Sequence, residues 1–102
     1  MPKHALESLT ETMFYVLMAL YREEKCGIDI AAWIEAQTRG RLILGPATLY
    51  TILAKFEKEK LIRDTKVEGR KRTYAITDSG RQAYREELSR LRRCLEDGET
   101  VL

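Results

Sequence analysis

Hydrophobic residues recur along this chain with spacings that predict helices in some segments and strands in others. In four segments they recur every three or four positions, the spacing of one helix face, so we predict helices at residues 9–24, 27–38, 46–62 and 78–97. Residues 63–67 and 73–76 are predicted as two strands joined by a turn around Gly69. Residues 41–44 are too few for a helix and are predicted as a short strand. The pattern indicates a mainly α chain with a small β-ribbon.

The first predicted helix carries two apolar stripes. Ser8 followed by Glu11 is a capping-box pattern at its start. One stripe contains Met13, Val16, Leu17 and Leu20, and the stripe beside it contains Phe14, Met18 and Tyr21. A helix on the surface of a domain needs only one apolar stripe. We therefore expect this helix either to be central or to touch a partner subunit as well.

The third predicted helix has an apolar inner face and a polar outer face. Gly45-Pro46 suits its start, because proline lacks an N–H that the first helical turn would leave unpaired. The inner face contains Leu49, Ile52, Leu53, Phe56 and the stem of Lys60. The outer face contains Ala47, Thr48, Tyr50, Thr51, Ala54, Lys55 and Lys58. Small, hydroxylated and cationic side chains of this kind suit close approach to DNA bases and phosphates.

The last predicted helix follows Thr77, a suitable N-cap, and is expected to stop at Gly98. Its apolar residues Tyr84, Leu88, Leu91 and Leu95 are spaced four, three and four apart, which is a coiled-coil seam of under two heptads. The seam could pack on its own domain. A terminal helix after a β-ribbon has little core left to cover, however, so we expect the seam to pair with a second subunit.

Charge is distributed unevenly along the chain. Its 102 residues include 44% hydrophobic and 33% charged residues, which is typical of one folded domain. The net charge is only +2, but residues 41–75 contain nine Lys or Arg against four Asp or Glu. The remainder is therefore slightly acidic, and the asymmetry predicts one basic face suited to a nucleic acid.

Several classes of protein are disfavoured by what the sequence contains. Cys26 and Cys94 are 68 positions apart without a Cys/His cluster, and His4 is the single histidine, so we expect reduced thiols and no metal site. No catalytic constellation or phosphate-binding glycine loop is present, so we expect neither an enzyme nor a cofactor. The apolar stretch at residues 13–20 is too short to cross a membrane. We expect a cytoplasmic protein.

The order of helices and strands, together with four motifs, resembles the PadR family of transcriptional regulators. The motifs are Leu44-Gly45-Pro46-Ala47-Thr48-Leu49-Tyr50, Phe56-Glu57-Lys58-Glu59-Lys60-Leu61-Ile62, Gly69-Arg70-Lys71-Arg72-Thr73-Tyr74 and Ile76-Thr77-Asp78-Ser79-Gly80-Arg81. The resemblance covers nearly the whole chain. Members usually have the pattern G-x-G-T-L-Y at the start of the third helix, and Ala47 here replaces its second glycine. The short last helix resembles that of the compact branch, with a single C-terminal dimerisation helix.

The resemblance implies a winged helix-turn-helix fold and a homodimeric regulator, usually a repressor, that binds double-stranded DNA. Residues 1–77 would form the DNA-binding domain and residues 78–102 the dimerisation helix, as one structural unit. The third helix would enter the major groove, and the β-ribbon, or wing, would contact the backbone or the minor groove. The residues facing DNA would be Thr48, Tyr50, Thr51 and Lys55 on the helix and Arg70, Lys71 and Arg72 on the wing.

Each assignment has a structural alternative. Tyr50 could be a residue at the edge of the core, Lys55 and Lys58 could belong to a solvated helix face, and the wing cations could serve only solubility. The whole domain could be a protein–protein adaptor that uses a winged helix without binding DNA, since fold alone does not fix function. An adaptor should expose an apolar patch where a DNA-binding protein exposes cations.

A small hydrophobic effector is a further candidate partner. Some members of the family bind flat aromatic compounds near the dimer interface. Phe14, Met18, Tyr21 and Trp33 could form an apolar site of that kind between subunits. The alternative for Trp33 is core packing, because it lies at core spacing beside Ile30 and Ile34.

Overall fold

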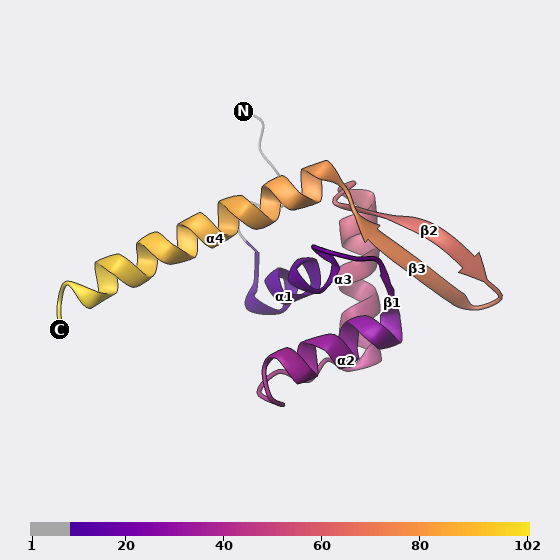
Figure 1. Ribbon diagram of the computed structural model, residues 1–102, viewed down its shortest axis with the longest axis horizontal. Helices are drawn as coiled ribbons and strands as arrows, with labels where there is room; N and C mark the ends of the chain where they lie inside the picture. Colours follow the sequence, from indigo (N-terminus) through magenta and orange to yellow (C-terminus); the bar gives the residue numbers. More distant parts are fainter. Residues whose placement is uncertain (1–8) are drawn as a thin grey trace.

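The structure of this chain is a computed structural model that describes residues 9–102 (Figure 1). Ser8 and His4, which carried two of the expectations above, lie outside the described residues. The elements in chain order are α1 (Glu11–Leu20), β1 (Lys25–Cys26), α2 (Gly27–Gln37), α3 (Pro46–Lys58), β2 (Ile62–Glu68), β3 (Lys71–Ile76) and α4 (Asp78–Glu99).

The first helix is shorter than predicted at its C-terminal end. Thr10 is the N-cap, and its hydroxyl oxygen accepts a hydrogen bond from the Met13 N–H at 3.1 Å. The helix ends at Leu20 instead of continuing to residue 24. The chain turns back there, because Lys25 Nζ donates to the Ala19 carbonyl at 2.7 Å and Lys25 begins β1. Long-range pairing therefore overrides the local helical pattern.

The sheet has three antiparallel strands in the order β1-β3-β2. The short first strand pairs Lys25 with Tyr74, whereas residues 41–44, predicted as a strand, form an irregular loop. That prediction was wrong because local sequence does not show which segment meets β3. The wing strands β2 and β3 were correctly predicted, and they meet at a turn where Gly69 has a left-handed φ of +62°. A β-bulge interrupts their pairing between Asp64 and Lys66.

The core lies where α1, α2, α3 and the base of the sheet meet. Its largest fully buried side chains are Phe56, Leu17, Leu20, Ile30, Ile34, Leu53, Ile62 and Val16. The predicted inner face of α3 is confirmed, since Leu49, Ile52, Leu53 and Phe56 are all buried. Lys60 is an exception: it lies beyond the end of α3, is exposed and has a left-handed φ of +64°.

The start of α4 is fixed to the end of α3. Thr77 is the N-cap, as predicted, and accepts a hydrogen bond from the Gly80 N–H at 3.1 Å. Its own hydroxyl donates to the Lys60 carbonyl at 2.7 Å. From this junction α4 passes beside α1 and then extends away from the other elements (Figure 1). The helix continues through Gly98 to Glu99, so the predicted stop at Gly98 was wrong.

These elements form a winged helix-turn-helix, which confirms the predicted fold class. The helix pair α2 and α3 is the helix-turn-helix, and β2 with β3 is the wing. Within residues 9–102, none of the helices combines the length and apolar character needed to span a membrane.

Candidate nucleic-acid interface

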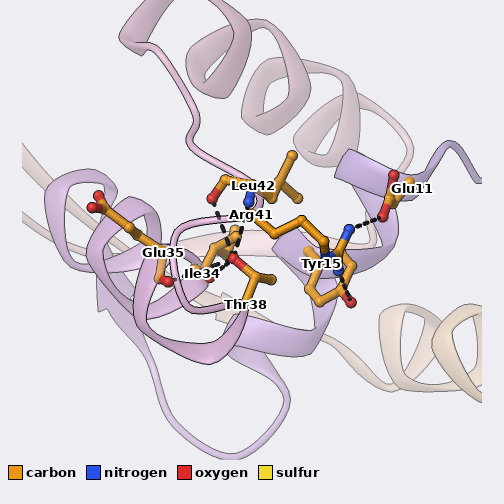
Figure 2. A network of polar contacts seen from close by, with 7 residues as sticks. All are labelled: Glu11, Tyr15, Ile34, Glu35, Thr38, Arg41 and Leu42. Atoms are coloured by element: carbon orange, nitrogen blue, oxygen red, sulfur yellow. Dashed lines mark hydrogen bonds and ion pairs between the residues drawn. The ribbon is translucent and has the colours of Figure 1, made fainter.

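A network of polar contacts fixes the loop that leads into α3 (Figure 2). Arg41 donates to Glu11 Oε2 at 2.8 Å and to the Tyr15 hydroxyl at 2.9 Å, which ties the loop to α1. Thr38 Oγ1 donates to the Ile34 carbonyl at 2.9 Å and accepts from the Leu42 N–H at 3.1 Å. The start of α3 therefore has a defined position relative to α1 and α2.

Arg41 is part of this polar network as well as of the basic segment at residues 41–75. The hydrogen bond to Glu11 raises the pKa of its guanidinium, and the neighbouring Tyr15 has the same effect. The Arg41 guanidinium also lies 5.7 Å from the Tyr15 ring centroid, a cation–π distance. Part of the positive charge counted between residues 41 and 75 is therefore balanced within the molecule.

The outer face of α3 is open. Thr48, Tyr50, Thr51 and Lys55 are all exposed. Tyr50 is 48% exposed, and its hydroxyl lies against Gly27, the first residue of α2. This position is compatible both with contact to DNA and with a place at the edge of the core.

The wing places its three predicted cations in two different environments. Arg70 and Lys71 are exposed at the turn, and within residues 9–102 neither has an ion-pair partner. Arg72 lies one position further along β3, and its Nη1 is 3.1 Å from Asp64 Oδ2 and 3.8 Å from Glu57 Oε1. Arg72 thus joins the wing to α3.

The acidic partners of Arg72 are residues that the sequence did not single out. Desolvation by burial, followed by the nearby Asp64 charge, raises the pKa of the Glu57 carboxyl. Burial is also the main reason why the pKa of the neighbouring Tyr74 phenol is raised. The β-bulge after Asp64 sets the local register that pairs Asp64 with Tyr74, and no local sequence pattern marks that register.

A groove of about 720 Å³ separates α3 from the wing. One wall comes from the start of α2 at Gly27 and Ile28, a second from Tyr50 and Ala54 of α3, and the third from the wing residues 70–72. Tyr50 and the three predicted wing cations therefore meet at this groove from separate parts of the chain, whereas Thr48, Thr51 and Lys55 are not among its lining residues. The hydroxyl and cationic groups of this groove suit contacts with a sugar–phosphate backbone, and the carboxylates of Asp29 and Glu57 also line it.

The predicted dimerisation seam has two parts. Tyr84 is half-buried within its own chain, where its ring stacks on Phe14 at a centroid distance of 4.8 Å and an interplanar angle of 5°. Further along α4, Leu88 and Leu91 are each 37% exposed and Leu95 is 60% exposed. The three leucines thus form an apolar stripe with room for further packing.

Three of the four predicted effector residues meet at one cavity. Met18, Tyr21 and Trp33 line a space of about 600 Å³ together with Tyr84 and charged side chains. Phe14 is not among the lining residues, because it is buried behind the Tyr84 ring. Trp33 is half-buried against the core and lies 5.6 Å from Lys25 Nζ, so core packing and cavity lining apply to it together.

Glu87 on α4 is a buried charged residue, at a position where a helix that leaves its domain would be expected to be solvated. It is 6% exposed and accepts two hydrogen bonds from Arg90, at 3.0 and 2.6 Å. The Arg90 hydrogen bonds are the main reason why the pKa of the Glu87 carboxyl is lowered. In the sequence, a glutamate three positions before an arginine on a predicted helix could have indicated this ion pair.

Comparisons with known proteins identify a family of transcriptional regulators and one relative in sequence. The family model described as "Transcriptional regulator PadR-like family" matches residues 16–86. An uncharacterized 37.1 kDa protein in transposon TN4556 of Streptomyces fradiae is 34% identical over 83 residues, which are 81% of this chain but only 24% of that relative.

Two solved structures have the same fold. A transcriptional regulator from Clostridium thermocellum, Cth-833, is 23% identical with a TM-score of 0.78, over 86% of this chain and 89% of that one. Bacillus subtilis PadR, solved in complex with operator DNA, is 24% identical with a TM-score of 0.68, over 78% of this chain and 47% of that one.

Proposed function

The chain belongs to the PadR-like family of transcriptional regulators, and from this premise we propose that it is a homodimeric repressor that binds an operator through α3 and the wing. One observation carries the proposal: Tyr50 of α3 and the wing cations Arg70 and Lys71 line one groove. Thr48, Thr51 and Lys55 are exposed on the same helix. It acts in the cytoplasm, where the regulated DNA lies. Residues 1–77 are the DNA-binding part and residues 78–102 the dimerisation helix.

The two sets of residues have different tasks. Thr48 and Thr51 at the start of α3 can approach base edges in the major groove, which is where a recognition helix reads sequence. Arg70 and Lys71 hold charges without protein partners within residues 9–102, so they are available to phosphates, which supply affinity without sequence information. Bacillus subtilis PadR was solved with operator DNA, which supports the same role for this chain.

Dimerisation is the second component of the proposal. Leu88, Leu91 and Leu95 form an exposed apolar stripe on a helix that extends beyond its own domain (Figure 1). Pairing two such helices buries the stripe in the manner of a short coiled coil. Two recognition helices related by twofold symmetry would then bind an inverted repeat, with half-sites about 34–36 Å apart or a multiple of that spacing.

Retention of genomic DNA fragments tests the function directly. We expect the protein to retain fragments that contain an inverted repeat, and to bind them with an affinity that falls steeply with salt. The Arg70→Ala/Lys71→Ala variant should bind more weakly on every sequence, and each lost phosphate contact should reduce the salt slope by about 0.9. Because a dimer carries every substitution twice, the total reduction should reach about twice that of one subunit.

The control for the wing variant removes two exposed cations elsewhere. Arg22→Ala/Arg93→Ala changes the net charge by the same amount but leaves α3 and the wing intact. We expect its salt slope to match that of the unaltered protein. An equal reduction in both variants would show that overall charge, and not the wing, determines the salt dependence. Retention of no fragment would contradict the DNA-binding function and favour the adaptor.

An effector is the third component of the proposal. The cavity beside Trp33 lies between α1, α2 and α4, so a ligand in it would contact both the DNA-binding part and the dimerisation helix. Planar hydrophobic compounds should quench the fluorescence of Trp33, the single tryptophan, and lower the affinity for operator DNA. Absence of quenching and of a change in thermal midpoint across a panel of such compounds would contradict this component.

A further inference from the structure

Gly27 has no conformational reason to be a glycine. It is the first residue of α2, and within the described residues only Gly40 and Gly69 among the glycines have a positive φ. The backbone at Gly27 would therefore accept a side chain. The space beside it would not, because a Cβ atom there would overlap the Tyr50 hydroxyl and would lie 2.9 Å from Tyr50 Cζ and 3.2 Å from Cε1.

The end of the Tyr50 side chain occupies the space that a side chain at position 27 would need. Tyr50 belongs to the exposed face of α3, yet its hydroxyl end reaches the first turn of α2. The ring thereby becomes part of the wall of the groove between α3 and the wing. Tyr50 keeps 48% of its surface exposed, so it remains accessible to a ligand in that groove.

We propose that Gly27 is a positioning residue for DNA binding, which seats the Tyr50 ring against α2 so that its hydroxyl faces a backbone phosphate in the groove. The inference rests on the proposed DNA-binding function. Tyrosine hydroxyls are common hydrogen-bond donors to phosphates. A methyl group at position 27 displaces the Tyr50 ring into the groove. The displaced hydroxyl no longer donates to the phosphate, and the ring obstructs the DNA strand.

The first test is the affinity of Gly27→Ala for operator DNA. We expect a loss of about tenfold, the effect of one displaced contact, with an unchanged thermal midpoint, because alanine is favourable in a helix. Gly98→Ala is the matched control, since Gly98 has no atom within 4 Å of an added Cβ. It should bind as the unaltered protein does. A marked fall in the thermal midpoint of Gly27→Ala would make Gly27 a structural residue and overturn the proposal.

A double-mutant cycle distinguishes the positioning role of Gly27 from a general structural role. Tyr50→Ala alone should weaken binding, and adding Gly27→Ala to it should have no further effect, because the overlap has been removed. If Gly27→Ala lowers the affinity for operator DNA equally with Tyr50 present and with Tyr50 replaced by alanine, the proposal is overturned. Full binding by Gly27→Ala or by Tyr50→Ala alone would also overturn it.

The outcomes also separate this proposal from the proposed function. If the unaltered protein retains DNA while Gly27→Ala binds equally well, only the role of Gly27 is lost. If the unaltered protein retains none, both proposals are overturned together.

Discussion

Arg72 lies in the basic wing, yet its nearest charged partners are acidic residues of its own subunit. Its Nη1 is 3.1 Å from Asp64 and 3.8 Å from Glu57, while Arg70 and Lys71 extend from the turn. Two carboxylates close to one guanidinium reduce the charge that it presents to a phosphate. At the level of the residue, we therefore expect the three wing cations to differ in function although they are adjacent in sequence.

Single substitutions distinguish the two environments. Arg70→Ala should lower both the affinity for DNA and the salt slope, as loss of a phosphate contact does. Arg72→Ala should change the salt slope less and should lower the unfolding free energy by less than about 1 kcal/mol, because the guanidinium is half exposed and solvent screens the ion pair. Titration of operator DNA at several salt concentrations, with thermal melts, measures both. A larger change in salt slope for Arg72→Ala than for Arg70→Ala would contradict this assignment.

The wing cations are recognisable in the sequence, but this difference among them is not. Counting charges treats Arg70 and Arg72 alike, because both follow Gly69 in one basic run. The different environments of Arg70 and Arg72 depend on the pairing register of β2 and β3, which the β-bulge after Asp64 shifts. Such a shift arises from contacts across the sheet, so a single strand sequence does not show it.

At the level of elements, α3 was the most predictable part and the segment at residues 21–26 the least. The inner face of α3 was predicted correctly because its apolar period is sustained over three turns. The end of α1 and strand β1 were missed because residues 21–24 continue a local helical pattern, whereas Lys25 pairs with Tyr74, 49 positions away. The position of the open groove also depends on non-local packing, although the residues on two of its walls were anticipated.

The joint between α3 and the wing predicts a pH dependence of stability. Burial and the nearby Asp64 raise the pKa of Glu57 above its ordinary value of 4.5. A raised folded-state pKa means that the protonated form favours folding, so this contribution is present below the unfolded-state pKa and is lost as pH rises through the folded-state pKa. Glu57→Gln removes this loss.

Thermal melts from about pH 4, near the ordinary pKa of a glutamate, up to about pH 7 measure the effect. We expect the midpoint of Glu57→Gln to rise relative to the unaltered protein as pH increases. Glu59→Gln is the control, because Glu59 is the next acidic residue along the chain and lies outside the Arg72 ion pairs. If the thermal midpoints of Glu57→Gln and the unaltered protein differ by the same amount at every pH, the raised pKa of Glu57 is contradicted.

For the whole molecule, charge and apolar surface are separated in space. The exposed wing cations Arg70 and Lys71 lie at the end of the β2–β3 ribbon, and the exposed leucines of α4 lie on the helix that extends in another direction (Figure 1). A domain of 102 residues is small enough that burying additional apolar surface in a dimer adds substantially to its stability. Oligomerisation and folding should therefore be linked.

That link gives a prediction for the assembly. If α4 pairs with its copy, the thermal midpoint should rise with protein concentration, because mass action favours the folded dimer. Leu88→Glu/Leu91→Glu places like charges in the seam and should yield a monomer whose midpoint is lower and independent of concentration. Sedimentation equilibrium measures the mass, and melts at several concentrations measure the linkage. Ser89→Glu, an added charge at an exposed position beside the seam, should remain a dimer. A Leu88→Glu/Leu91→Glu protein that still sediments as a dimer would place the interface on another surface, such as the α1 side of the cavity beside Trp33.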